Sequence, residues 1–347
     1  MAIRKQPQAV PEGTPLITTV HPKAAIPGGE FQIHGKSLAR GERPRVVIGE
    51  VAAPIVIGSE SFVVVRVPEG SSGGDLVLSH DDRSSSPWTC DIGIQIADSL
   101  HPVANPAVDA LGNIYATFSG SRGQKTPVSV FQVDATTGQS APFVSDLMNA
   151  SGLAIDHDDV LYVSSRQEGN VYRVSSAGNS AIYVEGMGVA TGIVFDPDGN
   201  LYVGDRSGTI FKVSRQRQIY VFATLESSIS AYHLAFGPDK YLYVTGPTTS
   251  SFDCVHRISP AGEVEVFYRG LGRPQGMAFD AEDNLYVASS FRGRRGVARI
   301  TPDRNAELFL SGPGIVGLAF APGKNLVLAT SGALYRVHVG IDGRRAP

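Results

Sequence analysis

With 347 residues, 42% of them hydrophobic, and a net charge of −3, the chain has the composition of a folded globular protein, and no charge excess favours nucleic acid or a membrane surface. Its 39 glycines and 22 prolines are many for a helical protein and suit a chain with many tight turns. The two cysteines, Cys90 and Cys254, are too few for a disulfide framework or a four-ligand metal site.

Residues 1–13 show no strand pattern and are expected to form a disordered tail. The opening stretch MAIRKQPQAVPEGTPLITTV carries charges but no apolar central region, so it is not a secretory signal as written. We therefore expect a cytoplasmic protein, or an extracytoplasmic one if a signal was removed. No apolar run reaches the roughly 18 residues of a membrane-spanning helix, so the sequence predicts no span.

Residues 14–91 contain short runs of alternating hydrophobicity, such as GEFQIHG, RVVIGE and FVVVRVP, separated by turn residues. This pattern predicts a small antiparallel β-sandwich. The stretch PLITTVHPKAAIPGGEFQIHGKSL resembles the opening of IPT/TIG immunoglobulin-like domains, which begin with a Pro-containing strand, Pro-Gly-Gly and a strand ending in Gly. The resemblance implies an interaction or spacer domain without catalytic residues.

The rest of the chain is an internal repeat of about 42 residues. FDPDGNLYVGD (195–205) has relatives in IDHDDVLYVSS (155–165), FGPDKYLYVTG (236–246) and FDAEDNLYVAS (279–289). Weaker copies are VDALGNIYATF and FAPGKNLVLAT, and each copy is followed by a second shared run such as IFKV or VYRV. The central positions of the six copies are Tyr115, Tyr162, Tyr202, Tyr243, Tyr286 and Val327.

Four short strands in each of six repeats predict an all-β fold in which residues 92–340 form a six-bladed β-propeller. The last repeat stops after its third strand, so the strand within 92–100 (GIQIADS, 93–99) should complete it and remove the open edges. Residues 341–347 are expected to be a tail.

The repeats resemble NHL-type propellers and the wider group that includes gluconolactonases and streptogramin B lyases. The shared motif is DPDGNLYVGD, which is specific for the architecture and weak for function. In such propellers, ligands bind on the face that carries the loops between the second and third strands and between successive blades.

The Asp196 turn is the place where the motif could hold calcium. An EF-hand loop counted from Asp196 would need Gly at its sixth position and Glu at its twelfth. The sequence has Leu201 and Ser207 there. We therefore interpret this stretch as a turn between two strands.

The first strand of each blade should line the channel, and the repeat predicts the ring of side chains at its start. One position before the recurring glycine lie Ala104, Ser151, Thr191, Tyr232, Gln275 and Val316; at the glycine position lie Asn105, Gly152, Gly192, His233, Gly276 and Gly317. The ring has no carboxylate, and no position of this sequence matches a metal-binding or catalytic residue of the lactonase or lyase sites. We accordingly predict no metal and no cofactor.

Tyr232 and His233 depart from small residues at these two positions and are the candidate catalytic pair. A phenol and an imidazole at a channel mouth supply a hydrogen-bond donor and a general base. The alternative is that both side chains only fill the channel.

Arginines are frequent in the loops of the same face, and a guanidinium binds carboxylate or phosphate through two parallel hydrogen bonds. The alternative is solvated loop charge. The FRGRRG stretch (291–296) lacks interleaved aromatic residues, which argues against nucleic acid. The arginines in question are Arg122, Arg166, Arg206, Arg273, Arg292, Arg294 and Arg295.

These patterns predict a binding protein for a small anionic molecule or a protein partner. The alternative is a gluconolactonase-like hydrolase or a streptogramin-lyase-like enzyme acting on a lactone or small anionic substrate. The sequence carries no signal for an oligomeric state. The predicted ligand-binding residues are Asn105, Ser151, Arg166, Thr191, Arg206, Tyr232, His233, Arg273, Gln275 and Arg292.

Overall fold

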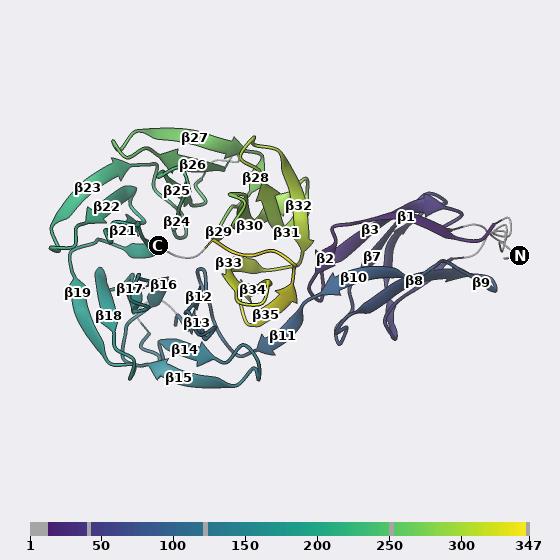
Figure 1. Cartoon of the computed structure of the whole chain (residues 1–347), viewed down its shortest axis with the longest axis horizontal. Helices are drawn as coiled ribbons and strands as arrows, with labels where there is room; N and C mark the ends of the chain where they lie inside the picture. The colour runs from purple at the N-terminus through teal and green to yellow at the C-terminus, as the bar shows by residue number, and fades with distance from the viewer. Residues whose placement is uncertain (1–12, 40–42, 121–123, 250–252, 345–347) are drawn as a thin grey trace, which may run out of the picture. The chain divides into compact units, whose positions relative to one another are not determined.

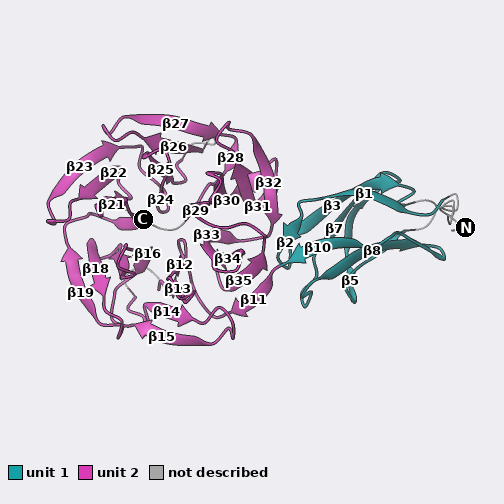
Figure 2. Ribbon diagram, in the orientation of Figure 1, with its two compact units in different colours: residues 1–92 teal, residues 93–347 magenta. Residues whose placement is uncertain are grey.

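A computed structural model describes residues 13–39, 43–120, 124–249 and 253–344. Within these ranges every regular element is a β-strand, so the protein is all-β. None of the described residues forms a helix that is long and hydrophobic enough to cross a membrane. The chain divides into two compact units, residues 1–92 and residues 93–347 (Figure 2). The predicted disordered tail, residues 1–13, falls outside the described residues except for Gly13.

The first unit contains two β-sheets that share one hydrophobic core. Phe31, Ile33, Leu76 and Leu78, which come from both sheets, are fully buried in it. One sheet has the order β1 (Leu16–His21), β3 (Glu30–Lys36), β7 (Phe62–Arg66) and β6 (Ile55–Gly58). The other has the order β2 (Ala24–Ala25), β10 (Trp88–Ile92), β8 (Gly74–His80), β4 (Arg45–Ile48) and β5 (Val51–Ala53), with β9 (Arg83–Ser84) beside β8.

In the described part of the second unit, antiparallel strands form six groups that follow one another around a ring (Figure 1). The first strand of each group lies innermost in the ring. The first three groups are β12–β15 (Ala107–Val108, Ile114–Thr117, Val130–Val133, Ser140–Val144), β16–β19 (Ala150–Ile155, Leu161–Ser165, Asn170–Val174, Ser180–Val184) and β20–β23 (Ala190–Phe195, Leu201–Asp205, Thr209–Val213, Ile219–Thr224).

The fourth group is β24–β27 (His233–Phe236, Leu242–Thr245, Cys254–Ile258, Val264–Arg269). The fifth is β29–β32 (Met277–Phe279, Leu285–Phe291, Arg294–Ile300, Ala306–Ser311), with the short β28 (Leu271–Gly272) also on β30. The sixth contains β33–β35 (Ile315–Ala321, Asn325–Thr330, Leu334–His338) and takes its fourth strand from β11 (Ile94–Ala97), which pairs antiparallel with β35.

The repeated Asp-x-x-x-Asn-x-Tyr motif forms a local hydrogen-bond cluster at the turn between the first two strands. The Asp196 carboxylate accepts hydrogen bonds from the backbone N–H and the side-chain amide of Asn200, both at 2.8 Å, and from the Tyr202 hydroxyl at 3.3 Å. The same three bonds recur at Asp109 and at Asp280. The carboxylate therefore stabilises the turn by local hydrogen bonds, in agreement with our interpretation of the sequence.

The same tyrosines join neighbouring sheets. Tyr286 packs edge-on against Phe309 of its own sheet, with ring centroids 4.9 Å apart, and against Phe320 of the next inner strand at 5.2 Å. Equivalent pairs across sheets are Tyr162–Phe195 and Tyr243–Phe279. Such edge-to-face aromatic pairs add to the stabilisation that burial provides. The recurring tyrosine and phenylalanine thus fix the spacing around the ring.

The predicted tail at residues 341–347 is not free in its described part. Ala281 donates its backbone N–H to Asp342 O at 2.9 Å, and Arg344 donates its N–H to Phe279 O at 3.0 Å. Gly343 forms an isolated bridge with Asp280. This segment is therefore held by backbone hydrogen bonds to the fifth sheet.

Candidate functional site

The starts of the inner strands pack tightly against one another at one end of the ring. A Cβ atom added to Gly152 would overlap the backbone oxygen of Thr191, and one added to Gly192 would overlap that of Tyr232. Gly317 meets the backbone of Ala104 in the same way. At these three positions glycine is therefore required, because the neighbouring backbone approaches too closely for a side chain.

Asn105 occupies the glycine position of the first sheet and reaches across to the fifth and sixth sheets. Its amide nitrogen donates to Met277 O at 2.8 Å, and its amide oxygen accepts from the Leu318 N–H at 3.1 Å. A Cβ on Gly276 would fall on this oxygen. The nitrogen and the oxygen of the Asn105 amide are thus both hydrogen-bonded within the protein. Asn105 therefore bridges the sheets and does not present an accessible group to a ligand.

Tyr232 and His233, the candidate catalytic pair, are each only 3% exposed. Tyr232 packs in the core between the third and fourth sheets and donates its hydroxyl to the backbone oxygen of Glu226. Burial, followed by the charges of Glu226 and Asp205, raises the pKa of Tyr232 to about 12. Burial lowers the pKa of His233 to about 4. The structure gives these two side chains packing positions, which favours the filling interpretation.

The side chains of Thr191 and Ser151 are occupied by internal hydrogen bonds, whereas Gln275 is bonded through its backbone. Thr191 donates its hydroxyl to Gly204 O at 2.9 Å and accepts the Tyr232 N–H at 3.1 Å. Ser151 donates to Asn149 O at 3.2 Å, and both side chains are buried. Gln275 is half-buried, and its backbone oxygen accepts from the Thr245 hydroxyl at 2.5 Å.

Arg166 and Arg206 are brought together at the same end of the ring. Each follows the last residue of the second strand in its sheet, at matching positions of the neighbouring second and third sheets. Arg166 is half-buried and Arg206 is exposed. Burial, and then the positive charge of Arg206, lower the pKa of the Arg166 guanidinium. Two cations therefore lie close enough to repel each other.

The carboxylates next to these arginines in sequence accept hydrogen bonds from other residues. Asp205 accepts the Val189 N–H at 2.8 Å, the Ser207 N–H at 3.2 Å and the Ser207 hydroxyl. Glu168 accepts the Tyr172 hydroxyl at 2.8 Å. Among the described residues, neither Arg166 nor Arg206 forms an ion pair, and the Arg166 guanidinium makes one long hydrogen bond, 3.5 Å, to Gly120 O.

The other predicted arginines do not join this pair. Arg273 and Arg292 are exposed and belong to the fifth sheet region, two sheets beyond Arg206. Arg292 lies over the Phe291 ring, 5.1 Å from its centroid. Arg122 lies outside the described residues.

Within the described ranges, one group of three side chains has metal-ligand atoms close together. Asp156, His157 and Asp158 have ligand atoms within 4.8 Å of one another, in the turn between β16 and β17. His157 and Asp158 are exposed, and Asp156 already accepts the backbone N–H groups of Asp158 and Val160 at 3.0 Å. The cluster is a solvated version of the turn seen at Asp196.

A cavity that we did not predict from the sequence lies in the middle of the ring. It lies on the other side of Asn105 from the tight glycine packing and is lined by the later residues of the inner strands, together with Arg344. The signal was present in the sequence, because four repeats end the inner strand with phenylalanine: Phe195, Phe236, Phe279 and Phe320.

Comparison with family models gives one match. The IPT/TIG domain model matches residues 15–90, which covers almost the whole first unit. Residues 15–90 are therefore a TIG domain. The search of curated proteins finds no match to the chain.

Three solved structures that are similar to this chain are distant from it in sequence. A gluconolactonase from Xanthomonas campestris is 16% identical, with 72% of this chain and 89% of that chain covered and a TM-score of 0.60. An auxiliary nutrient binding protein from Bacteroides thetaiotaomicron is 12% identical, with 94% and 98% covered and a TM-score of 0.55. A virginiamycin B lyase from Staphylococcus aureus is 12% identical, with 94% and 95% covered and a TM-score of 0.52. These similarities establish a propeller-like all-β fold and leave the activity open, because one fold hosts many functions.

Proposed function

We propose that this protein is a binding protein that takes a small anionic ligand between Arg166 and Arg206. The observation that carries the proposal is the pair itself: two neighbouring guanidiniums that have no carboxylate partner among the described residues, one of them half-buried. Burying a charge without a counter-charge costs free energy, and a bound anion removes that cost. A guanidinium fork also matches carboxylate and phosphate groups in geometry.

We further infer that the six sheets are the blades of an NHL-type β-propeller and that the TIG domain is an immunoglobulin-like sandwich. The ring of antiparallel sheets and the closing strand β11 support the first inference. The two sheets around a shared core support the second. In this arrangement Arg166 and Arg206 stand on the propeller face that carries the loops between the second and third strands.

The gluconolactonase-like or lyase-like alternative gains no catalytic pair from Tyr232 and His233. A general base must reach the proton that it abstracts; both side chains are buried, and Tyr232 is packed between two sheets. The neighbours that are named as enzymes support this alternative only through their shared fold. The binding function therefore has the stronger support.

The test compares the double variant Arg166→Gln/Arg206→Gln with the wild-type protein by calorimetric titration of inorganic phosphate and of citrate. We expect the wild type to bind at least one of them saturably and the variant to lose this binding. At an anion concentration 100 times Kd, the wild type should gain about 2.7 kcal/mol of unfolding free energy. Sodium chloride at equal ionic strength separates specific binding from screening.

The matched control is Arg292→Gln, which removes an exposed arginine from another sheet. It should bind as the wild type does. Equal heats for the wild type and the double variant, or no saturable heat with either anion, would contradict the proposal.

A further inference from the structure

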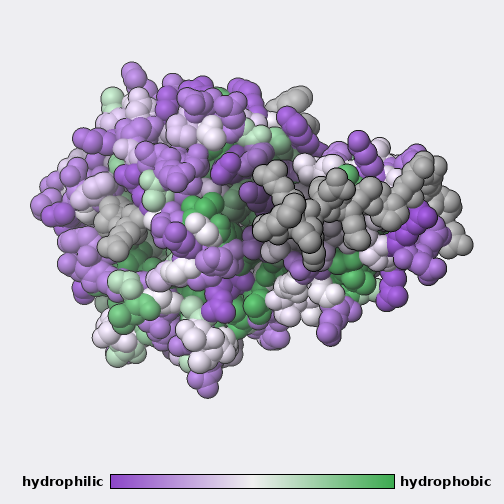
Figure 3. Space-filling model, turned by 45° about the vertical axis from the view of Figure 1, so that its right-hand side comes forward, coloured by the Kyte–Doolittle hydropathy of each residue, from purple (hydrophilic) through white to green (hydrophobic). Residues whose placement is uncertain are grey.

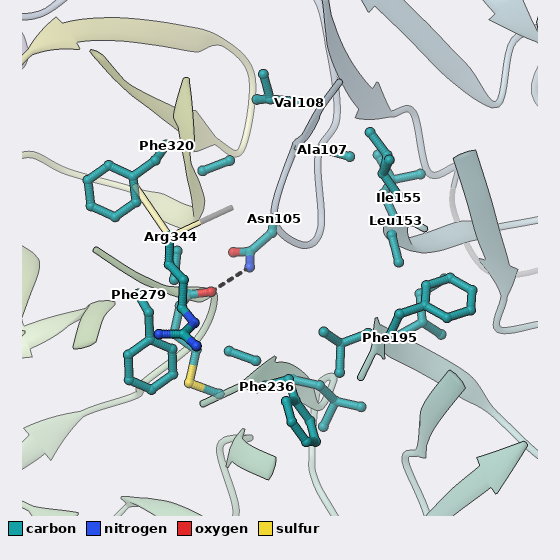
Figure 4. A pocket seen from close by; sticks show the side chains of 18 of the residues that line it. Asn105, Ala107, Val108, Leu153, Ile155, Phe195, Phe236, Phe279, Phe320 and Arg344 are labelled. Atoms are coloured by element: carbon teal, nitrogen blue, oxygen red, sulfur yellow. Dashed lines mark hydrogen bonds between the residues drawn. The ribbon is translucent and has the colours of Figure 1, made fainter. Parts of the chain in front are cut away.

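The centre of the ring holds a cavity of about 280 Å³. Hydrophobic side chains gather in the middle of the face seen in Figure 3, among mostly hydrophilic ones. Leu153, Ile193, Leu234 and Leu318 form a first apolar layer below Asn105. The second layer lies at the ends of the inner strands, where Figure 4 shows the side chains of Val108, Ile155, Phe195, Phe236, Phe279 and Phe320 around the cavity.

The cavity has few side chains that can offer a polar group. Asn105 lines it, but its amide already donates to Met277 O and accepts from Leu318 N–H. Among the described residues, Arg344 is the single charged side chain in the lining, and it donates to the Asp283 carboxylate at 2.9 Å. A charged occupant would therefore meet no unpaired counter-charge here, and its burial would be costly.

The backbone offers a second kind of contact. The inner strands β16, β20, β24 and β33 stand at the end of their sheets, so the edge that faces the channel belongs to no further strand ladder. Part of this edge is bonded within the ring, because the Leu318 N–H donates to Asn105 and the Gly192 N–H to Tyr232 O. An edge of this kind presents N–H and C=O groups at regular intervals. A mainly apolar molecule with one or two hydroxyl or carbonyl groups could satisfy such groups while filling the apolar space.

The segment Asp342–Arg344, which we call the strap, lies against the end of the cavity opposite Asn105. Its backbone is hydrogen-bonded to Phe279 and Ala281. Gly343 packs so closely on the inner strand of the sixth sheet that a Cβ would overlap the Cβ of Phe320. The strap is therefore seated on the ring, and it places Arg344 in the cavity lining.

We propose that this cavity is a second binding site, separate from the arginine pair, for a small, uncharged and mainly apolar molecule, and that the strap controls access to it. The size is adequate, because an apolar engineered cavity of roughly 150 Å³ binds benzene. The ligand class follows from the apolar layers, the paired Arg344 and the strand edges that face the channel without a further strand.

The probe for the test is 2-naphthol, an uncharged two-ring molecule with one hydroxyl group. Calorimetric titration should show one saturable site in the wild type. Ala278→Phe puts a large side chain at a half-buried lining position and should weaken binding by about tenfold or more. Val194→Met, a milder change at another lining position, should weaken it in the same direction and serves if Ala278→Phe does not fold. Ala141→Phe makes the same change on the exposed edge of β15 and should leave binding unchanged.

The strap is tested by kinetics. Gly343→Val should displace the strap through its overlap with Phe320 and speed both association and dissociation of 2-naphthol by about tenfold, as expected for removal of a lid. Gly332→Val is the matched control, because a Cβ at Gly332 meets no atom within 4 Å. The proposal is overturned if neither the wild type nor Gly343→Val binds 2-naphthol saturably, or if binding survives unchanged in both Ala278→Phe and Val194→Met. Unchanged rates in Gly343→Val would overturn the role of the strap.

Discussion

Single residues of the repeat act mainly through short-range hydrogen bonds. Asp280 accepts from Asn284 and Tyr286, four and six positions further along the chain, and is 1% exposed. Burial, and then the charge of Asp280, raise the pKa of Tyr286, so its hydroxyl stays protonated and continues to donate. The motif that could be mistaken for a metal loop is thus a turn that satisfies its own polar groups.

His233 should make the protein less stable in acid. Its folded pKa of about 4 lies below the ordinary value of 6.5, so between these pH values the unfolded chain binds a proton that the folded chain does not. The free energy of unfolding should therefore fall as the pH drops through this window, by up to about 3 kcal/mol in total. Above pH 6.5 the contribution is fully present.

Urea unfolding of the wild type and His233→Leu between pH 7.5 and 4 measures this contribution. The variant should show a flatter dependence on pH, and the exposed His157→Gln control should follow the wild type. Parallel curves for the wild type and His233→Leu would contradict a neutral, buried His233.

At the scale of strands, the ring is closed by an element that lies far away in the sequence. β11 pairs with β35, with Ile94 opposite Arg336 and Gln95 opposite Tyr335. Ala97 and Leu100 are buried in a cluster with Val327 and Leu334 of the sixth sheet. The closing strand therefore covers both an open backbone edge and part of a core.

Deleting residues 1–100 should unfold or aggregate the ring, whereas deleting residues 1–92 should leave it folded, because only the longer deletion removes β11. The loss includes the buried side chains of Ala97 and Leu100, and removal of a large buried side chain such as that of Leu100 costs several kcal/mol. Circular dichroism and thermal unfolding of the two fragments provide the measurement. A cooperative, stable fragment starting at residue 101 would show that closure does not depend on β11.

At the scale of the whole molecule, the chain has separate hydrophobic cores. The core of the first unit contains only residues between Ile17 and Ile92. The core clusters of the second unit are formed by residues from Ala97 onward. Units with separate cores behave as domains that can fold alone.

We expect two unfolding transitions in calorimetry, one for each unit. The fragment 1–92 should reproduce one transition and the fragment 93–347 the other. A single transition in the full chain, with no folded state for either fragment, would show that the two cores depend on each other.

The sequence alone determined the all-β class and the role of the Asp196 turn, and it predicted a division near residue 92 and the phase of the repeat. These features depend on neighbours within a few positions: strand alternation has a period of two, and the aspartate cluster spans six residues. The closing strand also followed, because a repeat that lacks one strand leaves an edge that must be paired.

Only the tertiary structure decided which predicted site residues are accessible. Asn105 bonds to Met277, 172 positions away, and Tyr232 packs between two sheets. Neither contact can be predicted from the residues that are close in sequence. Two arginines at matching repeat positions become neighbours because adjacent sheets bring equivalent positions together. The cavity and its strap depend on how six strand ends converge around one axis and where the chain returns after the last strand. The repeat specifies each strand, and the packing of distant strands decides which side chains solvent or a ligand can reach.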